Sequence, residues 1–256
     1  MNPGEHALMA RVEAEHWWYR ALRDVLRRTL LQPDLALPAA PAVLDAGCGT
    51  GENLRLLAGL LAPGYLGGFD LSEEALAFAR DKAPGADVYA ADVCDPELRA
   101  PALDLVTSLD VICIPGVARS RPGLRRLVGH LKPGGLFVLN LPAYAWLYGE
   151  HDVAVHTSER FTLPGVRGLL EELGLEVVRG SYRLCALLPL VAATRLPGAR
   201  RAKRGGEAGA RSQLHAGSGG ALGSLLYGAL RAENALVARG VRLPFGSSVF
   251  AVGRKP

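Results

Sequence analysis

The stretch VLDAGCGTGE, residues 43–52, constrains the fold of this chain more than any other segment. A strand-like run carries Asp45 near its end, three glycines follow at alternate positions, and a helix-like run begins at once. A strand, a glycine-rich turn and a helix N-terminus together form the nucleotide-binding opening of a doubly wound α/β sheet. The segment therefore predicts a turn whose backbone a ligand approaches closely.

Strand-like and helix-like runs alternate through the rest of the first 142 residues. Expected strands cover 42–47, 65–70, 86–92, 103–112 and 133–142, and expected helices cover 51–61, 72–83 and 121–131. This alternation favours a mostly parallel sheet covered on both faces. Further on, a helix at 162–174, a strand at 175–184 and a last strand at 247–256 are expected.

We expect two parts in the chain. Residues 1–40 form an N-terminal lid helix, at 5–31, and a proline-rich linker, while 41–256 form the main domain. Within that domain, 184–245 form a helical and flexible insertion before the last strand, with a helix at 221–239. The glycine- and arginine-rich piece 198–220 has no periodic apolar face, so we expect it to be flexible.

The composition is that of a globular protein. Hydrophobic residues make up 49% of the 256 residues, and a net charge of +4 is too small to indicate nucleic-acid binding. The four cysteines form no C-x-x-C pair, which favours reduced thiols and a cytoplasmic location. The apolar run 184–194 is too short to cross a bilayer.

The acids around the glycine loop indicate the kind of ligand. Glu52 stands where a dinucleotide-binding loop has its third glycine, which argues against an NAD-dependent oxidoreductase. Asp45 and Glu52 instead favour a cationic ligand without phosphate, such as S-adenosylmethionine (SAM). Asp70 ends the second strand 19 residues after Gly51, the spacing of an acid that binds ribose hydroxyls. Asp92 ends the third strand, where it can accept the adenine amino group.

In order, VLDAGCGTGENL, GGFDLSEEALAFAR, AADVCD, DLVTSLDVI and LKPGGLFVLNLPAY resemble the successive motifs of class I SAM-dependent methyltransferases. The resemblance implies a Rossmann-like, seven-stranded sheet with an antiparallel last strand, and SAM as cofactor with S-adenosylhomocysteine (SAH) as product. The segment HWWYR, residues 16–20, resembles an N-terminal element of some bacterial relatives. The cofactor-binding residues implied are Gly47, Cys48, Gly49, Gly51, Asp70, Leu71, Asp92, Val93 and Leu109, with Asp45 beside them and Tyr19 and Arg20 from the lid.

The methyl acceptor is expected between the lid and the segment after the fifth strand. Expected acceptor contacts are His16, Trp18, Tyr144, Trp146 and Tyr148. For a hydroxyl acceptor a base is needed, and His151 oriented by Asp152 is the first candidate, with His156 and His16 as alternatives. One departure is DVICIPGV at 110–117, where many relatives have an acid–histidine pair, so no catalytic role is assigned there.

The sequence thus predicts a cytoplasmic methyltransferase for a small-molecule or lipid- or sugar-linked acceptor, most readily an O-methyltransferase. Two alternatives stay open: an NAD-dependent oxidoreductase, and a SAM-binding regulatory protein without turnover. No nucleic-acid partner and no metal are expected. The apolar and arginine-bearing insertion also permits peripheral contact with a membrane or a lipid-linked substrate. The oligomeric state is left undetermined.

Overall fold

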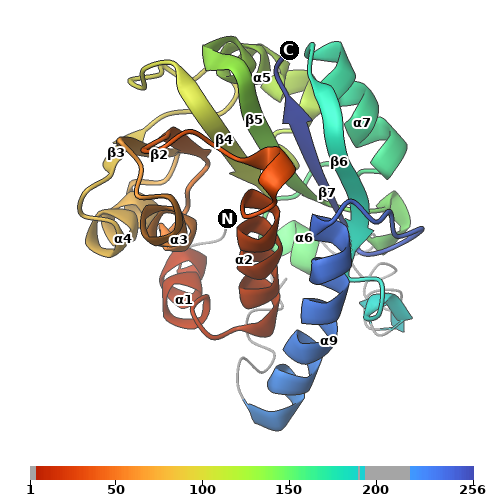
Figure 1. Ribbon diagram of the computed structural model, residues 1–256. Coiled ribbons are helices and arrows are strands. Elements are labelled where there is room, and N and C mark those ends of the chain that lie inside the picture. The colour runs from red at the N-terminus through yellow and green to blue at the C-terminus, as the bar shows by residue number, and fades with distance from the viewer. Residues whose placement is uncertain (1–3, 190, 194–219) are drawn as a thin grey trace.

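The computed structural model describes residues 4–189, 191–193 and 220–256. Its centre is one seven-stranded sheet in the order β3-β2-β1-β4-β5-β7-β6 (Figure 1). β7 runs antiparallel to both of its neighbours, and the other strand pairs are parallel. The strands are β1 (Ala42–Ala46), β2 (Tyr65–Asp70), β3 (Asp87–Ala90), β4 (Leu103–Leu109), β5 (Leu131–Pro142), β6 (Glu176–Arg183) and β7 (Ser248–Arg254). The predicted fold class and its antiparallel last strand are confirmed.

Helices cover both faces of this sheet. The helices are α1 (Glu5–Val12), α2 (Trp17–Leu30), α3 (Glu52–Leu61), α4 (Glu73–Lys82), α5 (Val117–His130), α6 (Glu150–Ala154), α7 (Leu163–Glu172) and α9 (Gly220–Ala238), with short 3-10 turns at Pro33–Leu35 and Ala145–Leu147. One apolar cluster joins the sheet to α5 and α7, and a second joins its other face to α2, α3, α4 and α9. A third, smaller cluster joins α2 to α9, which lie side by side in Figure 1.

The N-terminal helix differs from its prediction. Residues 5–31 form two helices, α1 and α2, separated by a turn at 13–16. His16 has an extended backbone, and its Nδ1 accepts the Trp18 N–H at 3.3 Å as the cap of α2. The turn directs α1 toward the glycine loop and α4, where the Glu13 side chain contacts Thr50 and Lys82. Tertiary contacts therefore override the continuous helical periodicity.

The fourth strand is shorter than predicted. β4 ends at Leu109, because Asp110 has a φ of 59° and turns the chain out of the sheet. Residues 103–112 are apolar enough to be predicted as one strand. The left-handed conformation of Asp110 cannot be predicted from that apolar pattern.

The late elements agree with expectation, with one part outside the structure. The helix at 162–174, the strand at 175–184 and the last strand are present as α7, β6 and β7. α9 matches the helix expected near 221–239. Of the segment 198–220, expected to be flexible, residues 198–219 lie outside the described residues, and Gly220 begins α9. Across the described part of the chain, every helix is too short or too polar to traverse a lipid bilayer.

Candidate functional site

The glycine loop joins β1 to α3 in a tight left-handed path. Gly47, Gly49 and Gly51 have φ values of 84°, 53° and 85°, which side chains rarely allow. Gly47 N–H and Cys48 N–H both donate to the carbonyl of Phe69, at 2.8 and 2.9 Å. A Cβ on Gly51 would lie 2.6 Å from the Ala79 backbone of α4. Gly51 therefore allows close packing between the loop and α4.

Asp70, at the end of β2, lies against this loop. Its Oδ2 accepts the Gly49 N–H and its Oδ1 the Ser72 N–H, both at 3.0 Å. A carboxylate has about four lone-pair positions, so each oxygen keeps one for a ligand. Ser72 itself caps α4 by accepting the Ala75 N–H, which fixes the backbone that holds Asp70.

A cavity of about 790 Å³ opens over the glycine loop and Asp70. Its walls come from α1 and α2, the loop, residues 70–72 after β2, residues 109–114 after β4, and several residues between 151 and 160. This is the carboxyl edge of the parallel strands, where open α/β sheets bind ligands.

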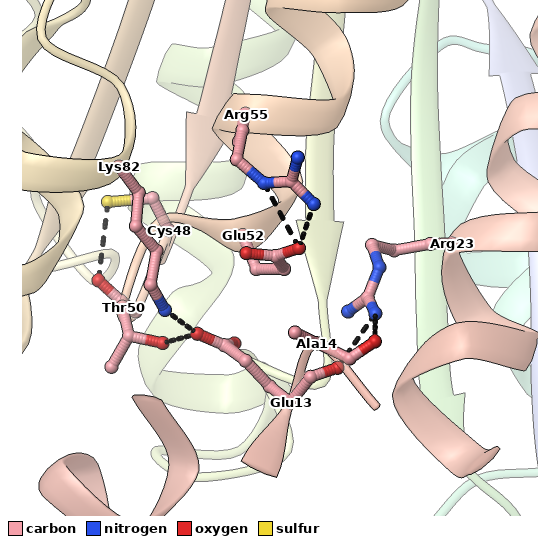
Figure 2. Close-up of polar contacts among 9 residues, drawn as sticks. Glu13, Ala14, Arg23, Cys48, Thr50, Glu52, Arg55 and Lys82 are labelled. Carbon is pink, nitrogen blue, oxygen red and sulfur yellow. Dashed lines mark hydrogen bonds and ion pairs between the residues drawn. The ribbon is translucent and has the colours of Figure 1, made fainter. Parts of the chain in front are cut away.

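The N-terminal helices are attached to the loop through Glu13. Glu13 is 5% exposed, and its carboxylate accepts a hydrogen bond from the Thr50 hydroxyl and pairs with Lys82 of α4 (Figure 2). Arg23 of α2 donates to the carbonyls of Glu13 and Ala14, at 2.7 and 3.1 Å. Glu52, the other acid beside the loop, forms an ion pair with Arg55 of the same helix, at 2.5 Å. α1 and α2 thus close one side of the cavity.

His16 presents an unpartnered donor to the cavity. Its Nδ1 accepts the Trp18 N–H, so the neutral ring carries its proton on Nε2. Burial lowers the pKa of His16, which favours that neutral form. The buried Nε2 has no hydrogen-bond partner among the described residues. This arrangement suits donation to a ligand rather than the base role considered for His16.

At the opposite wall, Arg160 and Asp152 form a buried ion pair. Arg160 Nη1 lies 2.6 Å from Asp152 Oδ1, and both side chains are 2% exposed. Arg160 Nε also donates to the carbonyls of Ala143 and Tyr144, and Asp152 Oδ2 accepts the Gly149 N–H at 2.9 Å. His151 lines the cavity beside this pair. Asp152 therefore pairs with Arg160. The sequence had predicted only that Asp152 orients His151.

Two further acids sit at the ends of the central strands. Asp45 is 1% exposed, with Oδ1 accepting the Thr107 hydroxyl at 2.5 Å and Oδ2 without a partner in the described structure. Burial raises the pKa of Asp45 to about 7, against the lowering effect of the Thr107 hydrogen bond. Asp110 lines the cavity, and its Oδ2 accepts the Asn140 side-chain N–H at 2.8 Å. Burial likewise raises the pKa of Asp110 to about 7, although Asn140, Arg183 and Arg160 lower it.

The structure brings about half of the predicted site residues together around one cavity. Those lining it are His16, Trp18, Tyr19, Gly47, Cys48, Gly49, Asp70, Leu71, Leu109, His151 and Asp152. The predicted residues outside its lining are Arg20, Asp45, Gly51, Asp92, Val93, Tyr144, Trp146, Tyr148 and His156.

The residues outside the cavity have other neighbours. Arg20 lies over the Tyr227 ring of α9, 4.1 Å from its centroid. Tyr144 stacks on Trp146 and Tyr182, with centroids 5.8 and 5.1 Å away. Asp92 is exposed and accepts the Cys94 N–H at 2.9 Å.

Sequence reasoning missed Glu13, Arg23, Asp110 and Arg160. The expected strand 103–112 placed Asp110 inside a strand, whereas in the structure Asp110 directly follows β4 at the cavity. Glu13 carried no local signal, because its partners Thr50 and Lys82 are 37 and 69 residues away.

The comparisons with known proteins agree with this geometry. Residues 43–135 match the family described as "Methyltransferase domain". A solved SAM-dependent methyltransferase from Clostridium acetobutylicum superposes with a TM-score of 0.58, at 11% identity, over 93% of this chain and 92% of its own. At that identity the likeness concerns the fold alone.

Two curated relatives match parts of the chain. Trans-aconitate 2-methyltransferase of Acidovorax sp. (strain JS42) is 32% identical over 145 residues, 56% of this chain and 51% of that protein. dTDP-3-amino-3,6-dideoxy-alpha-D-glucopyranose N,N-dimethyltransferase of Streptomyces fradiae is 35% identical over 149 residues, 57% of this chain and 52% of that protein. The chain spans about half the length of these relatives.

The strand order, the glycine loop and the cavity at the carboxyl edge define a class I methyltransferase fold. Residues 43–135, which contain the glycine loop and Asp70, are the part of the chain that is similar to the methyltransferase domain family. The cofactor of this family is SAM, and the loop with Asp70 fits it: backbone lies open to the ligand, and both Asp70 oxygens keep acceptor positions.

Proposed function

We propose that this protein transfers a methyl group from SAM to a small-molecule acceptor. The observation that carries the proposal is one continuous cavity. The glycine loop and Asp70 form one wall, and Asp110, His151 and Arg160 form another, so donor and acceptor have adjoining places. The matching methyltransferase family supports the reaction class.

In this proposal the glycine loop and Asp70 hold the cofactor. When bound, SAM supplies an electrophilic methyl group on a sulfonium sulfur. Gly47, Cys48 and Gly49 offer backbone to it, and Asp70 accepts the two ribose hydroxyls. Leu71 and Leu109 add apolar contact at its sides. Because the sulfonium is already a good leaving group, the main task of the protein is alignment of donor and acceptor.

The N-terminal helices act as a lid over this site. His16, Trp18 and Tyr19 come from α2 and the turn before it, and all line the cavity. Burial raises the pKa of Tyr19, with Glu13 and Asp110 adding to the effect, so its phenol stays protonated as a donor. A lid of this kind excludes water and orients the acceptor.

The relatives are named for two chemically different acceptors, so they support a small molecule and no single class of acceptor. One is named for trans-aconitate, a tricarboxylate, and the other for N,N-dimethylation of an amino sugar. Small acids, amines and alcohols therefore all belong in the first screen. For an alcohol, O-methylation with His151 as the base is the form of the proposal that the sequence suggested.

Calorimetry with SAM, SAH and NAD tests the cofactor, and SAH release across the acceptor panel tests turnover. We expect 1:1 binding of SAH and no binding of NAD. If NAD binds and SAH does not, the protein is not a methyltransferase. If SAH binds but no acceptor supports SAH release, the regulatory alternative gains support. His151→Ala should lower turnover of an alcohol roughly 10²–10⁴-fold and leave SAH affinity unchanged.

A further inference from the structure

Asp110 occupies a strained position at the end of β4. Its φ of 59° lies in the left-handed region that residues other than glycine rarely adopt. Two bonds to β5 hold it there: its N–H donates to the Asn140 carbonyl, and the Asn140 side chain donates to Oδ2, both at 2.8 Å. This conformation turns Asp110 out of the sheet at the cavity wall.

Asn140 is itself fixed by a buried arginine. Arg183 of β6 is 1% exposed, and its Nη1 donates to Asn140 Oδ1 at 2.9 Å. Because that bond takes the amide oxygen, the amide nitrogen faces Asp110. Oδ1 of Asp110 receives no hydrogen bond from the described residues. One carboxylate oxygen is thus anchored, and the other is open to a ligand.

The charged groups around Asp110 come from several elements. Arg183 of β6 and Arg160 before α7 both favour its ionised form. Tyr19 of α2 and the Cys113 thiol are also close to Asp110. Burial is the main cause that raises their pKa values, and the negative charge of Asp110 raises them further. Burial outweighs the two arginines, so the pKa of Asp110 rises to about 7. At neutral pH this carboxyl group exchanges a proton easily in either direction.

Apart from Asp110, and from Asp70, which accepts two backbone N–H groups, the acids at the cavity have salt-bridge partners. Glu13 pairs with Lys82, Glu52 with Arg55, and Asp152 with Arg160. The guanidinium groups at the cavity are Arg160, held by Asp152 and two carbonyls, and Arg23, held by two carbonyls. Among the described residues there is thus no set of open arginines to neutralise a polycarboxylate.

We propose that the acceptor is an amine, and that Asp110 binds its ammonium form and takes the proton that must leave before transfer. This assignment rests on the proposed methyl transfer. The R–NH₃⁺ group gives one proton to the Asp110 carboxylate and exposes its lone pair. The nitrogen then bonds to the methyl carbon as the C–S bond breaks, and that electron pair stays on sulfur. The product is R–NH₂⁺–CH₃, and Asp110 later releases its proton to solvent.

Proton-transfer energetics favour an amine over an alcohol. An alkylammonium group has a pKa near that of lysine, about 10.4, roughly three units above Asp110. An alcohol is a far weaker acid, close to water, so its proton transfer to Asp110 is many orders of magnitude less favourable than that of an ammonium group. A carboxylate acceptor needs no base and is repelled by the Asp110 charge.

The test uses SAH release from the whole chain with three probes: 3-amino-3-deoxy-D-glucose, D-glucose and trans-aconitate. The variant is Asp110→Asn, which keeps the shape and tolerates the same φ, and the matched control is Asp81→Asn, exposed on α4. We expect turnover of the amine alone, a fall of at least roughly 10²-fold in Asp110→Asn, and no change in Asp81→Asn. SAH affinity should stay within about threefold in both variants.

Each other outcome has a defined meaning. Preferred turnover of glucose or trans-aconitate overturns the amine assignment, as does SAH binding without turnover of the amine. Amine turnover that survives Asp110→Asn within threefold removes the proton role. A large loss of SAH affinity in Asp110→Asn would recast Asp110 as a cofactor ligand. Failure of the wild type to bind SAH would instead refute the proposed function itself.

Discussion

The carboxylate of Glu13, at the end of α1, bonds to the hydroxyl of Thr50 in the glycine loop (Figure 2). The same carboxylate pairs with Lys82 at the end of α4. One buried acid therefore ties three elements together: the lid, the loop and the helix behind the loop. This relationship makes the order of the lid depend on the loop that we propose to bind the cofactor.

Glu13→Gln should loosen the lid. A neutral amide loses the ion pair with Lys82 and leaves that ammonium group poorly compensated, at a cost of about 1–3 kcal/mol. We expect faster hydrogen exchange of the amides of α1 and weaker SAH binding. Glu15→Gln is the matched control, because Glu15 is exposed two residues away. Unchanged exchange in α1 would show that other contacts hold the lid.

Asp70→Ala should weaken SAH binding by about 2–4 kcal/mol, because two hydroxyl bonds to a charged acceptor are lost. Titration calorimetry measures this directly, with Asp81→Ala as the control on an exposed position of α4. Asp70 also holds the Gly49 and Ser72 N–H groups, so a melting curve must accompany the titration. A loss below tenfold in affinity would mean that Asp70 is not the ribose ligand.

The stability of the protein should fall as the pH rises from 5 to 8. The pKa of Asp45 is raised by burial to about 7 in the folded state, above its unfolded value. An acid whose pKa is higher in the folded than in the unfolded state stabilises the folded state fully at a pH below its unfolded pKa. This stabilisation is lost as the pH rises through the folded pKa. We expect a loss on the order of 2 kcal/mol from this group.

Asp45→Asn provides the check on that pH dependence. The variant keeps an oxygen for the Thr107 hydroxyl but cannot ionise, so its unfolding free energy should vary less between pH 5 and pH 8. Urea denaturation at both pH values measures the difference, with exposed Asp81→Asn as the control. Equal pH dependence in Asp45→Asn and the wild type would contradict the prediction.

Local pattern predicted the fold well because the signals of its central strands are local. The glycine loop, the run before it and Asp70 after the second strand are set by a few neighbouring residues each. The break between α1 and α2 is different, since it depends on Glu13 meeting Thr50 and Lys82. Periodicity within residues 5–31 contains nothing about those partners.

The acceptor side of the site was harder to predict for a related reason. The aromatic density at 144–148 drew attention, but Tyr144 stacks on Tyr182 of β6, 38 residues later. Asp110 went unassigned because its environment comes from Asn140 and Arg183 on two other strands. The sheet order brings these residues together, and no spacing along the chain encodes that order.

Asn140→Ala should raise the pKa of Asp110 further. The Asn140 hydrogen bond favours the ionised carboxylate, so its removal favours the protonated form and moves the titration of Asp110 to higher pH. Carboxyl ¹³C NMR of the SAH complex measures the titration midpoint of Asp110 in the absence of an acceptor. The Asp110 resonance is assigned by its loss in Asp110→Asn. Leu141→Val, also buried on β5, controls for destabilisation and should leave the Asp110 midpoint unchanged. The pH dependence of amine turnover should shift upward by the same amount in Asn140→Ala. A midpoint that falls, or one that moves equally in Leu141→Val, would show that Asn140 does not set the proton affinity of Asp110.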